Sequence, residues 1–332
     1  MKLYNEEVKQ KYLERFSNED TRGVYTRLFQ RSRETEEKLG KDIYNFSDNE
    51  MEDFLRNTLR PKTKESARTY CNVLANYVQW AIDNSHITGV THFNNPLKRR
   101  QEYFFEFVPD LKLYISKTEK MAIMATLLNK QDSFIIDALW EGIQGRQLSE
   151  LVNLRLEDVR KHEGVILLRD DNGIVTRKLV YTPEEVLEST IFDNAVLANK
   201  EKSYYKNNGV IDHDSNISET FALPFSDYVL KSAVTNSKNN KGGEKVSYYT
   251  IYNRLEMIRR LEGMEEYADA LTTVNIVRSG MIHMASKLYQ RDGEIGTKQI
   301  KEICARYNLK YKWSLKDFLN VDMVKSLYPE LA

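Results

Sequence analysis

The amino-acid sequence predicts a mainly α-helical protein with a small β hairpin and two domains. Its 332 residues are typical of two domains, each long enough to bury a hydrophobic core. Only 14 glycines and 6 prolines are present, which favours helices over many short turns. Apolar residues recur every three or four positions along most of the chain, and one region has a strand-turn-strand pattern. We therefore expect a helical domain at residues 1–97, a linker at 98–115 and a second domain at 116–332.

Four amphipathic helices are expected in the first domain. Ser47 begins the third of them, because Glu50 lies three residues later and completes a capping box. A basic loop at residues 59–64 precedes the fourth helix, and the Asn95-Pro96 dipeptide breaks the chain after it. The other three helices are expected at residues 5–16, 21–39 and 65–84.

The second domain begins with another capping box, formed by Ser116 and Glu119. A β hairpin is expected where strands at residues 165–168 and 175–180 flank the turn sequence Asp171-Asn172-Gly173. Most of the remaining chain has helical spacing, interrupted by polar loops. The expected helices are at 119–128, 133–141, 149–154, 182–199, 246–261, 271–288 and, as two pieces, 297–319, and the expected loops are at 207–218 and 236–244.

Composition and short motifs argue against several classes of protein. Cys71 and Cys304 lie far apart, which fits a reducing compartment and argues against a disulfide framework or a cysteine zinc site. The five histidines show no metal-ligand spacing. The polar N-terminus does not resemble a signal peptide, and no apolar run is long enough to cross a membrane. We expect a cytoplasmic protein with no metal, no cofactor and no membrane contact.

Basic residues are concentrated in two stretches of the chain. In total, 49 basic and 49 acidic residues cancel, which counts mildly against a nucleic-acid partner. However, residues 54–100 hold eight Lys or Arg against two Asp or Glu, and residues 231–260 hold seven against two. Two such stretches can form one electrostatic footprint for nucleic acid. The alternative is that both are solvated helix faces.

The helix expected at residues 271–288 carries one cation, Arg278, among the apolar residues of its first turns. A planar guanidinium binds phosphate through two parallel hydrogen bonds. Arg278 is therefore a candidate phosphate ligand. The alternative is an arginine at the edge of the core that has a carboxylate partner.

The order of these elements and several short motifs resemble the tyrosine recombinases, the phage integrase family. Ser149-Glu150-Leu151-Val152-Asn153-Leu154 resembles the segment that follows the family's first catalytic arginine, and Asn275-Ile276-Val277-Arg278 stands where the family has His-x-x-Arg. The first domain resembles the family's core-binding domain. The matching positions there are Tyr25, Phe29, Glu50, Phe54, Leu55, residues 62–70, Trp80, Ala81, Asn95 and Pro96. The resemblance covers nearly all 332 residues and implies a tyrosine-recombinase-like architecture.

The resemblance also implies where catalytic residues would lie, and several of these positions differ. The family cleaves DNA by attack of a tyrosine, helped by two arginines, a histidine and a lysine. Gln147 stands at the first arginine, with Arg146 beside it, and Asn275 stands at the histidine. Arg169 falls near the lysine position, and Lys178 on the returning strand is a substitute for it.

The positions of a further histidine and of the nucleophile differ as well. Arg306 replaces that histidine, and the same alignment puts Leu315 at the nucleophile. Counting from Arg278 leads instead to Tyr311, and Tyr307 and Tyr328 are the remaining candidates. A site that keeps one phosphate-binding arginine but lacks the histidine and the tyrosine should bind DNA without cutting it.

Within this fold, the sequence resembles the recombinase-derived master repressors of SPbeta-type Bacillus prophages. This resemblance implies a sequence-specific repressor that binds double-stranded operator DNA, maintains lysogeny and has no recombinase activity. It implies a cytoplasmic, nucleoid-associated location in a bacterial host, and it leaves open self-association or a phage-encoded antirepressor. Two alternatives are an active but divergent integrase and a helical interaction protein with no DNA role.

Eleven basic residues are candidates for DNA contacts. The helix that begins within residues 62–68 is the first candidate for reading bases, because a helix fits the major groove, and residues 245–260 are the second. We hypothesise that the two domains close on opposite faces of the duplex. Residues 298–319 fit either a helix-turn-helix or a helical pair packed on the domain. The eleven candidates are Arg60, Lys62, Lys64, Arg68, Arg146, Arg169, Lys178, Lys245, Arg254, Arg259 and Arg278.

Overall fold

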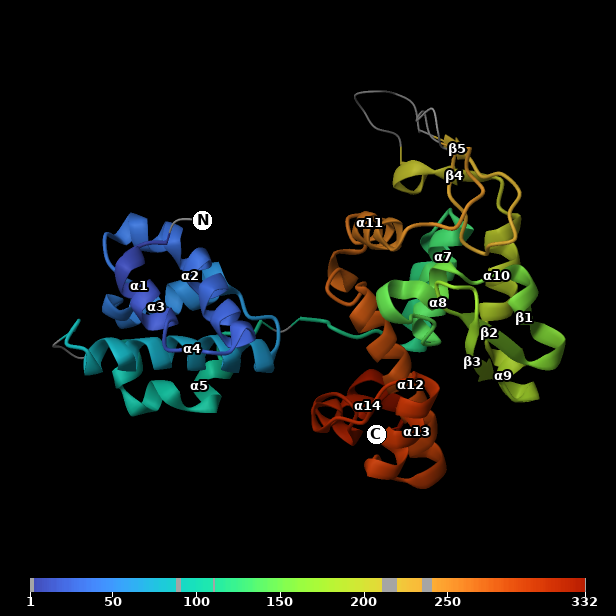
Figure 1. Ribbon diagram of the computed structural model, residues 1–332. Helices are drawn as coiled ribbons and strands as arrows, with labels where there is room; N and C mark the ends of the chain where they lie inside the picture. The colour runs from blue at the N-terminus through green and yellow to red at the C-terminus, as the bar shows by residue number, and fades with distance from the viewer. Residues whose placement is uncertain (1–2, 88–90, 110, 211–219, 235–240, 332) are drawn as a thin grey trace. The chain divides into compact units, whose positions relative to one another are not determined.

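The computed structural model describes residues 3–87, 91–109, 111–210, 220–234 and 241–331. The chain forms two compact units, Met1–Leu111 and Lys112–Ala332 (Figure 1). Each unit has its own hydrophobic core. The loops expected at 207–218 and 236–244 lie largely outside the described residues.

The first unit is helical and packs around aromatic side chains. Tyr12, Phe29 and Tyr77 are buried at its centre, where the Tyr77 ring centroid lies 4.7 Å from that of Phe29 and 4.9 Å from that of Tyr12. The predicted capping box of Ser47 and Glu50 is present at the start of the third helix. The helices are α1 (Glu6–Leu13), α2 (Glu19–Leu39), α3 (Asp48–Asp53), α4 (Lys64–Asp83) and α5 (Gln101–Phe105), and a π-helical turn, Phe54–Leu59, follows α3 directly.

The linker expected at residues 98–115 is largely part of the first unit, which is a correction. Helix α5 packs against α4, and its residues Tyr103 and Phe104 are buried in the first core. The Tyr103 hydroxyl donates to Glu52 Oε1 at 3.1 Å and lies 2.7 Å from His92 Nε2. These contacts hold the segment on the unit, and the division between units falls after Leu111.

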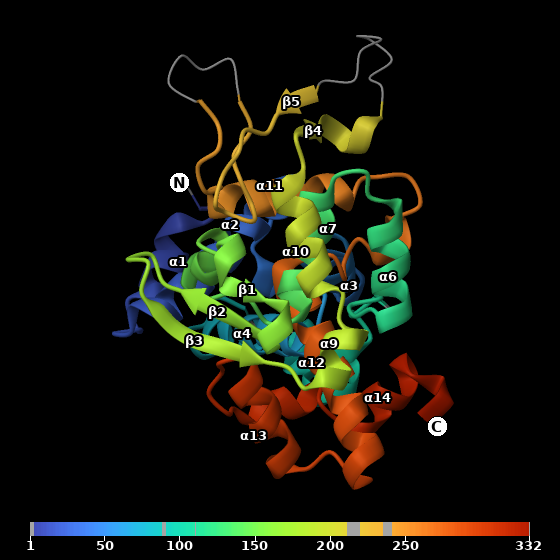
Figure 2. The ribbon, with the colours of Figure 1, turned by 90° about the vertical axis from the view of Figure 1, so that its right-hand side faces the viewer.

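Helix α7 is the centre of the second unit. Every residue from Gln131 to Trp140 is buried, because α10 and α12 pack on it (Figure 2). The approach of α12 is close: a Cβ added at Gly280 would lie 2.0 Å from the carbonyl oxygen of Trp140. The helices are α6 (Lys117–Thr126), α7 (Lys130–Trp140), α8 (Ser149–Val152), α9 (Pro183–Glu188), α10 (Ile191–Lys200), α11 (Tyr248–Ile258), α12 (Thr273–Asp292), α13 (Thr297–Arg306) and α14 (Val321–Leu327).

A small antiparallel sheet lies beside these helices, in the order β1-β2-β3. The predicted hairpin is confirmed: Ile166 on β2 pairs with Leu179 on β3, and both face the core. Gly173, with φ 76°, closes the turn by donating its N–H to the Asp170 carbonyl at 3.0 Å. A second pair of strands was not predicted. The strands are β1 (Val159–Arg160), β2 (Val165–Arg169), β3 (Val175–Val180) and the second pair β4 (Ser203–Tyr205) with β5 (Thr220–Ala222).

The mainly helical fold with small sheets is therefore the one that the sequence predicts, with two further local differences in the second unit. The helix expected at 182–199 is interrupted at Ser189, whose backbone is extended between α9 and α10. The helix-turn-helix interpretation of 298–319 is wrong, because only a five-residue 3-10 turn, Trp313–Asp317, follows α13 there. Among the described residues, none of the helices has the length and apolar character that crossing a membrane needs.

Candidate functional site

Arg278 lies in the second turn of α12 and has no carboxylate partner among the described residues. Its half-buried guanidinium carbon lies 5.0 Å from the Phe318 ring centroid. The helix start is held by Thr272, which accepts from the Asn275 N–H at 3.1 Å, and by the Asn275 side-chain amide, which donates to the Asp269 carbonyl at 2.8 Å. Asn275 therefore anchors the helix, while Arg278 keeps its donors for a ligand.

The turn before α8 presents Arg146 and Gln147 to solvent. Gln147 and Leu148 both adopt left-handed conformations, with φ of 53° and 60°, which is an uncommon and strained arrangement for residues with side chains. The buried Glu150 holds the turn, since one of its carboxylate oxygens accepts the Gln144 N–H at 3.1 Å. The Arg146 side chain has no hydrogen-bond or ion-pair partner within the described chain. Its guanidinium is accessible to a ligand.

The β2–β3 hairpin carries three cations with different surroundings. Arg169 makes two hydrogen bonds to the buried Asp158 carboxylate, at 2.8 and 2.7 Å, and this pairing raises the pKa of Arg169. Arg169 is thus a structural residue, not a free phosphate ligand. Arg177 binds both carboxylate oxygens of Glu150 at 2.7 Å. Lys178, its neighbour on the strand, is exposed and has no partner in the part of the chain that the structure describes.

Arg177 was missed by the sequence analysis, although it joins three segments. Besides Glu150, it donates to the Gly142 carbonyl at 2.6 Å and to the Arg306 carbonyl at 3.0 Å. It therefore ties the hairpin to the α8 turn and to the end of α13. The alternation of the strand was an available signal, because Arg177 lies on the same side of β3 as the buried Leu179.

The basic residues at 245–260 are mostly engaged inside the second unit. Arg254 is only 7% exposed, donates to Gln131 Oε1 at 3.0 Å and lies over the Tyr204 ring, so its predicted role in DNA contact is replaced by a structural one. Arg259 donates to the Ala268 carbonyl at 2.5 Å. Lys245 is exposed but donates to Asn153 Oδ1 at 2.8 Å.

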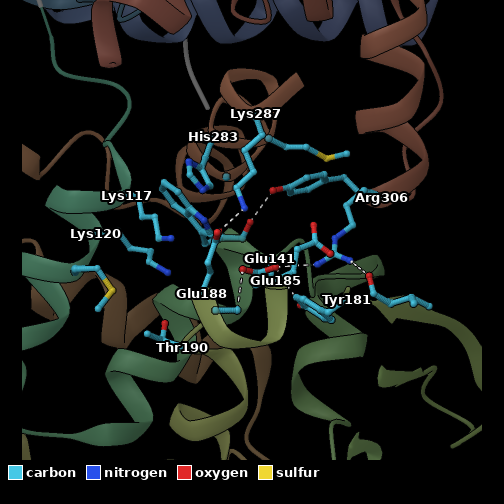
Figure 3. A pocket seen from close by; sticks show the side chains of 17 residues that line it. Lys117, Lys120, Glu141, Tyr181, Glu185, Glu188, Thr190, His283, Lys287 and Arg306 are labelled. Carbon is cyan, nitrogen blue, oxygen red and sulfur yellow. Dashed lines mark hydrogen bonds and ion pairs between the residues drawn. The ribbon is translucent and has the colours of Figure 1, made fainter. Parts of the chain in front are cut away.

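Arg306, expected at a histidine position of the tyrosine recombinases, lies in a pocket lined by charged and apolar side chains between α6, α7, α9, α12 and α13 (Figure 3). It donates to Glu141 at 2.9 Å and lies over the Tyr181 ring at 4.3 Å. On the opposite wall, burial and nearby lysines lower the pKa of His283 to about 3. Three of the pocket's four cations pair with carboxylates at 2.6–2.9 Å: Lys120 with Asp137, Lys287 with Glu188 and Arg306 with Glu141. The pocket is therefore largely charge-balanced, and no metal-binding group of acidic, histidine or cysteine side chains occurs in the described residues.

None of the three candidate tyrosines presents an accessible hydroxyl. Tyr307 is buried and donates to the Trp140 carbonyl at 2.8 Å. The Tyr328 side chain is buried, and its hydroxyl accepts the Lys117 N–H at 3.3 Å and lies 3.0 Å from His283 Nδ1. The Tyr311 hydroxyl is buried and has no hydrogen-bond partner among the described residues, and Leu315 packs against the same core.

In the first unit, the predicted basic residues gather around the start of α4. Arg60 closes the preceding turn with φ 42° and donates to the Asn57 carbonyl at 2.8 Å. Lys64 and Arg68 lie over the Phe105 ring at 5.3 and 5.8 Å and remain exposed, as does Lys62. The start of α4 therefore carries an accessible basic surface of the first unit.

Comparisons with known proteins agree with this two-unit organisation. Residues 114–329 match the family described as "MrpR, C-terminal catalytic domain", and residues 3–83 match "MrpR, N-terminal core-binding domain". The SPbeta prophage-derived uncharacterized protein YopR of Bacillus subtilis (strain 168) is 29% identical, over 99% of this chain and 97% of its own length. Two solved structures are similar at lower levels: XerA recombinase (16% identity, 98% of each chain, TM-score 0.40) and a lambda integrase (75–356) dimer bound to a COC' core site (12% identity, 95% of this chain and 93% of that chain, TM-score 0.42). The chain belongs to the MrpR family and carries both of its domains.

Proposed function

We propose that this protein binds double-stranded DNA without cutting it and represses genes of an SPbeta-type prophage. The observation that carries the proposal is the contrast between the cations and the tyrosines of the second unit. Arg146, Lys178 and Arg278 have no carboxylate partner among the described residues. The hydroxyls of Tyr307 and Tyr311, by contrast, are buried.

Binding and cleavage of DNA make different demands on such a site. Phosphate binding needs accessible cations, because release of counterions supplies much of the affinity. Cleavage needs an accessible nucleophile and donors that stabilise the charged intermediate. Gln147 carries no charge, and Asn275 uses its amide inside the protein. Loss of one such donor commonly lowers the rate by about 10²- to 10³-fold, so these residues favour binding over cleavage.

The prophage relative supports the prophage part of the proposal. That relative is described as SPbeta prophage-derived, and the match extends over 99% of this chain. A protein that occupies operator DNA without altering it excludes other proteins from the same site. In this proposal, backbone contacts by the free cations supply affinity, and base contacts from the α4 region select the operator. The protein would act in the cytoplasm of the bacterial host.

A gel shift with fragments of an SPbeta-type prophage genome, each sample run with and without SDS, tests the proposal. We expect a sequence-selective shift that SDS abolishes, because the complex is held by non-covalent contacts. A shifted band that survives SDS would mean a covalent protein–DNA adduct and an active recombinase, and Tyr311→Phe would then test the nucleophile. Absence of any shift at low salt, where phosphate contacts are strongest, would contradict DNA binding.

A further inference from the structure

Trp313 is exposed to solvent, whereas the other two tryptophans are buried. Its side chain is 73% exposed, whereas Trp80 and Trp140 are 6% and 3% exposed. An indole in water forgoes the stabilisation that its burial would give, and accessible tryptophans are enriched at binding surfaces. Trp313 is not part of the hydrophobic core of the second unit.

The backbone around Trp313 is well anchored. Asn308, with φ 53°, ends α13, and the following Leu309 N–H donates to the Cys304 carbonyl at 2.8 Å. Tyr311 packs against the core, and Leu319 donates its N–H to the Leu315 carbonyl at 2.8 Å. The indole is therefore displayed from a fixed 3-10 turn and is not part of a loose tail.

The surroundings of Trp313 are basic. Lys310, Lys312 and Lys316 lie within a few residues of it, and the Lys316 ammonium is 4.0 Å from the Trp313 ring centroid. None of these lysines forms an ion pair within the described residues, and Asp317 is the one acidic residue in the stretch 309–317. A surface of this charge attracts a polyanion and repels a second copy of itself.

The 3-10 turn that carries Trp313 lies next to Arg278, the candidate phosphate ligand on α12. Phe318 follows the turn directly, and its ring is the one over which Arg278 lies at 5.0 Å. A phosphate bound by Arg278 would therefore lie close to the turn that displays Trp313. Aromatic side chains beside such phosphates contact sugars and bases, and neighbouring lysines bind the flanking phosphates.

We propose that Trp313 is a DNA contact whose indole packs against a sugar next to the phosphate bound by Arg278, with Lys312 and Lys316 on the flanking phosphates. The inference rests on the proposed DNA-binding function and adds a specific contact to it. It also assigns a binding role to the stretch that the resemblance to tyrosine recombinases aligns with their nucleophile.

Tryptophan fluorescence of the intact protein measures this contact directly, because Trp313 is the exposed one of the three tryptophans. The protein is titrated with a prophage fragment that it shifts, and quenching by acrylamide is measured with and without DNA. We expect DNA to protect the quencher-accessible part of the emission. Trp313→Phe should remove that part in the free protein, since the two remaining tryptophans are buried.

Variants measure how much the contact contributes. Trp313→Ala should weaken DNA binding by about tenfold, as truncation of a well-packed aromatic side chain at an interface commonly does. Leu187→Ala is the matched control, because Leu187 is an 87% exposed apolar side chain on α9. The double variant Lys312→Ala, Lys316→Ala should reduce the slope of log affinity against log salt by about 2. Urea unfolding of each variant checks that the fold is intact.

The outcomes separate this inference from the proposed function. Unchanged DNA affinity in Trp313→Ala, with acrylamide access unaffected by DNA, would overturn the inference and leave DNA binding standing. Protection of Trp313 by higher protein concentration without DNA would show a contact between copies, and the inference would be wrong. No DNA binding by the unaltered protein at low salt would overturn both.

Discussion

Helices α11 and α12 each carry an arginine that the sequence marks as a DNA ligand, and the two have opposite surroundings. Arg254 on α11 is buried against α7, where Gln131 and Asp132 lie 3.0 and 3.6 Å from its guanidinium. Arg278 on α12 meets the ring of Phe318 and no carboxylate among the described residues. The difference comes from the residues that pack against each arginine: α7 supplies Asp132 beside Arg254, whereas Phe318 lies beside Arg278. A basic stretch of sequence becomes a basic surface only where no internal acid neutralises it.

The largest expected effect is on stability, and it comes from α11. Arg254→Ala would leave the buried Asp132 without its cation, and removal of one partner from a buried pair typically lowers the free energy of unfolding by about 3–5 kcal/mol. Urea denaturation measures this. Arg260→Ala on the same helix is the control, because Arg260 is 76% exposed and its pair with Glu256 should contribute less than about 1 kcal/mol. If both variants lowered the free energy of unfolding equally, Arg254 would not be a more important structural residue than the exposed Arg260.

A smaller effect, confined to DNA binding, is expected from α12. Arg278→Ala should lower affinity for a shifted prophage fragment by about 2 kcal/mol and reduce the salt slope by about 1, while leaving unfolding almost unchanged. Titrations at several salt concentrations measure both quantities. Arg291→Ala, near the other end of α12, is the control, because Arg291 is paired with Asp292 and Glu302. A stability loss in Arg278→Ala with normal affinity would make Arg278 a structural residue like Arg254.

The smallest expected effect concerns the buried face of the same helix. In the folded protein the pKa of His283 is lowered to about 3, mainly by burial, whereas an unfolded histidine has a pKa near 6.5. The unfolded chain therefore binds the extra proton between these values, so stability falls as pH drops below about 6.5.

This linkage predicts a loss of about 1 kcal/mol between pH 6.5 and 5.5 that His283→Gln should remove. Unfolding free energies at a series of pH values measure the slope. His162→Gln is the control, because the His162 side chain is 83% exposed. If the slope of stability against pH were unchanged in His283→Gln, the pKa of His283 would not be lowered in the folded protein.

The sequence predicts the parts of this fold that depend on local interactions. Capping boxes at Ser47 and Ser116 and the turn at Gly173 involve residues only a few positions apart, and the structure has all three. Helical spacing likewise gave α4 and α12 to within a few residues. Local chemistry is sufficient there, because both partners lie in one short segment.

The availability of individual cations was not predictable in the same way. Arg177 meets the carbonyls of Gly142 and Arg306, which lie 35 and 129 residues away in the chain. Arg169 meets Asp158, eleven residues earlier across a strand pair. Such partners are set by the packing of the whole unit, so the sequence identified candidate ligands without showing which are already occupied. Burial of the tyrosine hydroxyls has the same long-range origin.

Position 280 should accept only glycine, because α12 packs too closely on its neighbours there for any side chain. A Cβ there would lie 2.0 Å from the Trp140 carbonyl oxygen and 2.6 Å from the Tyr307 hydroxyl, so even alanine would force α7, α12 and α13 apart. Arg278, two residues earlier, has no such constraint. In a random library selected only for folding, codon 280 should stay glycine while codon 278 drifts. Under the proposed function, both codons should be retained in a library selected for repression of a reporter gene.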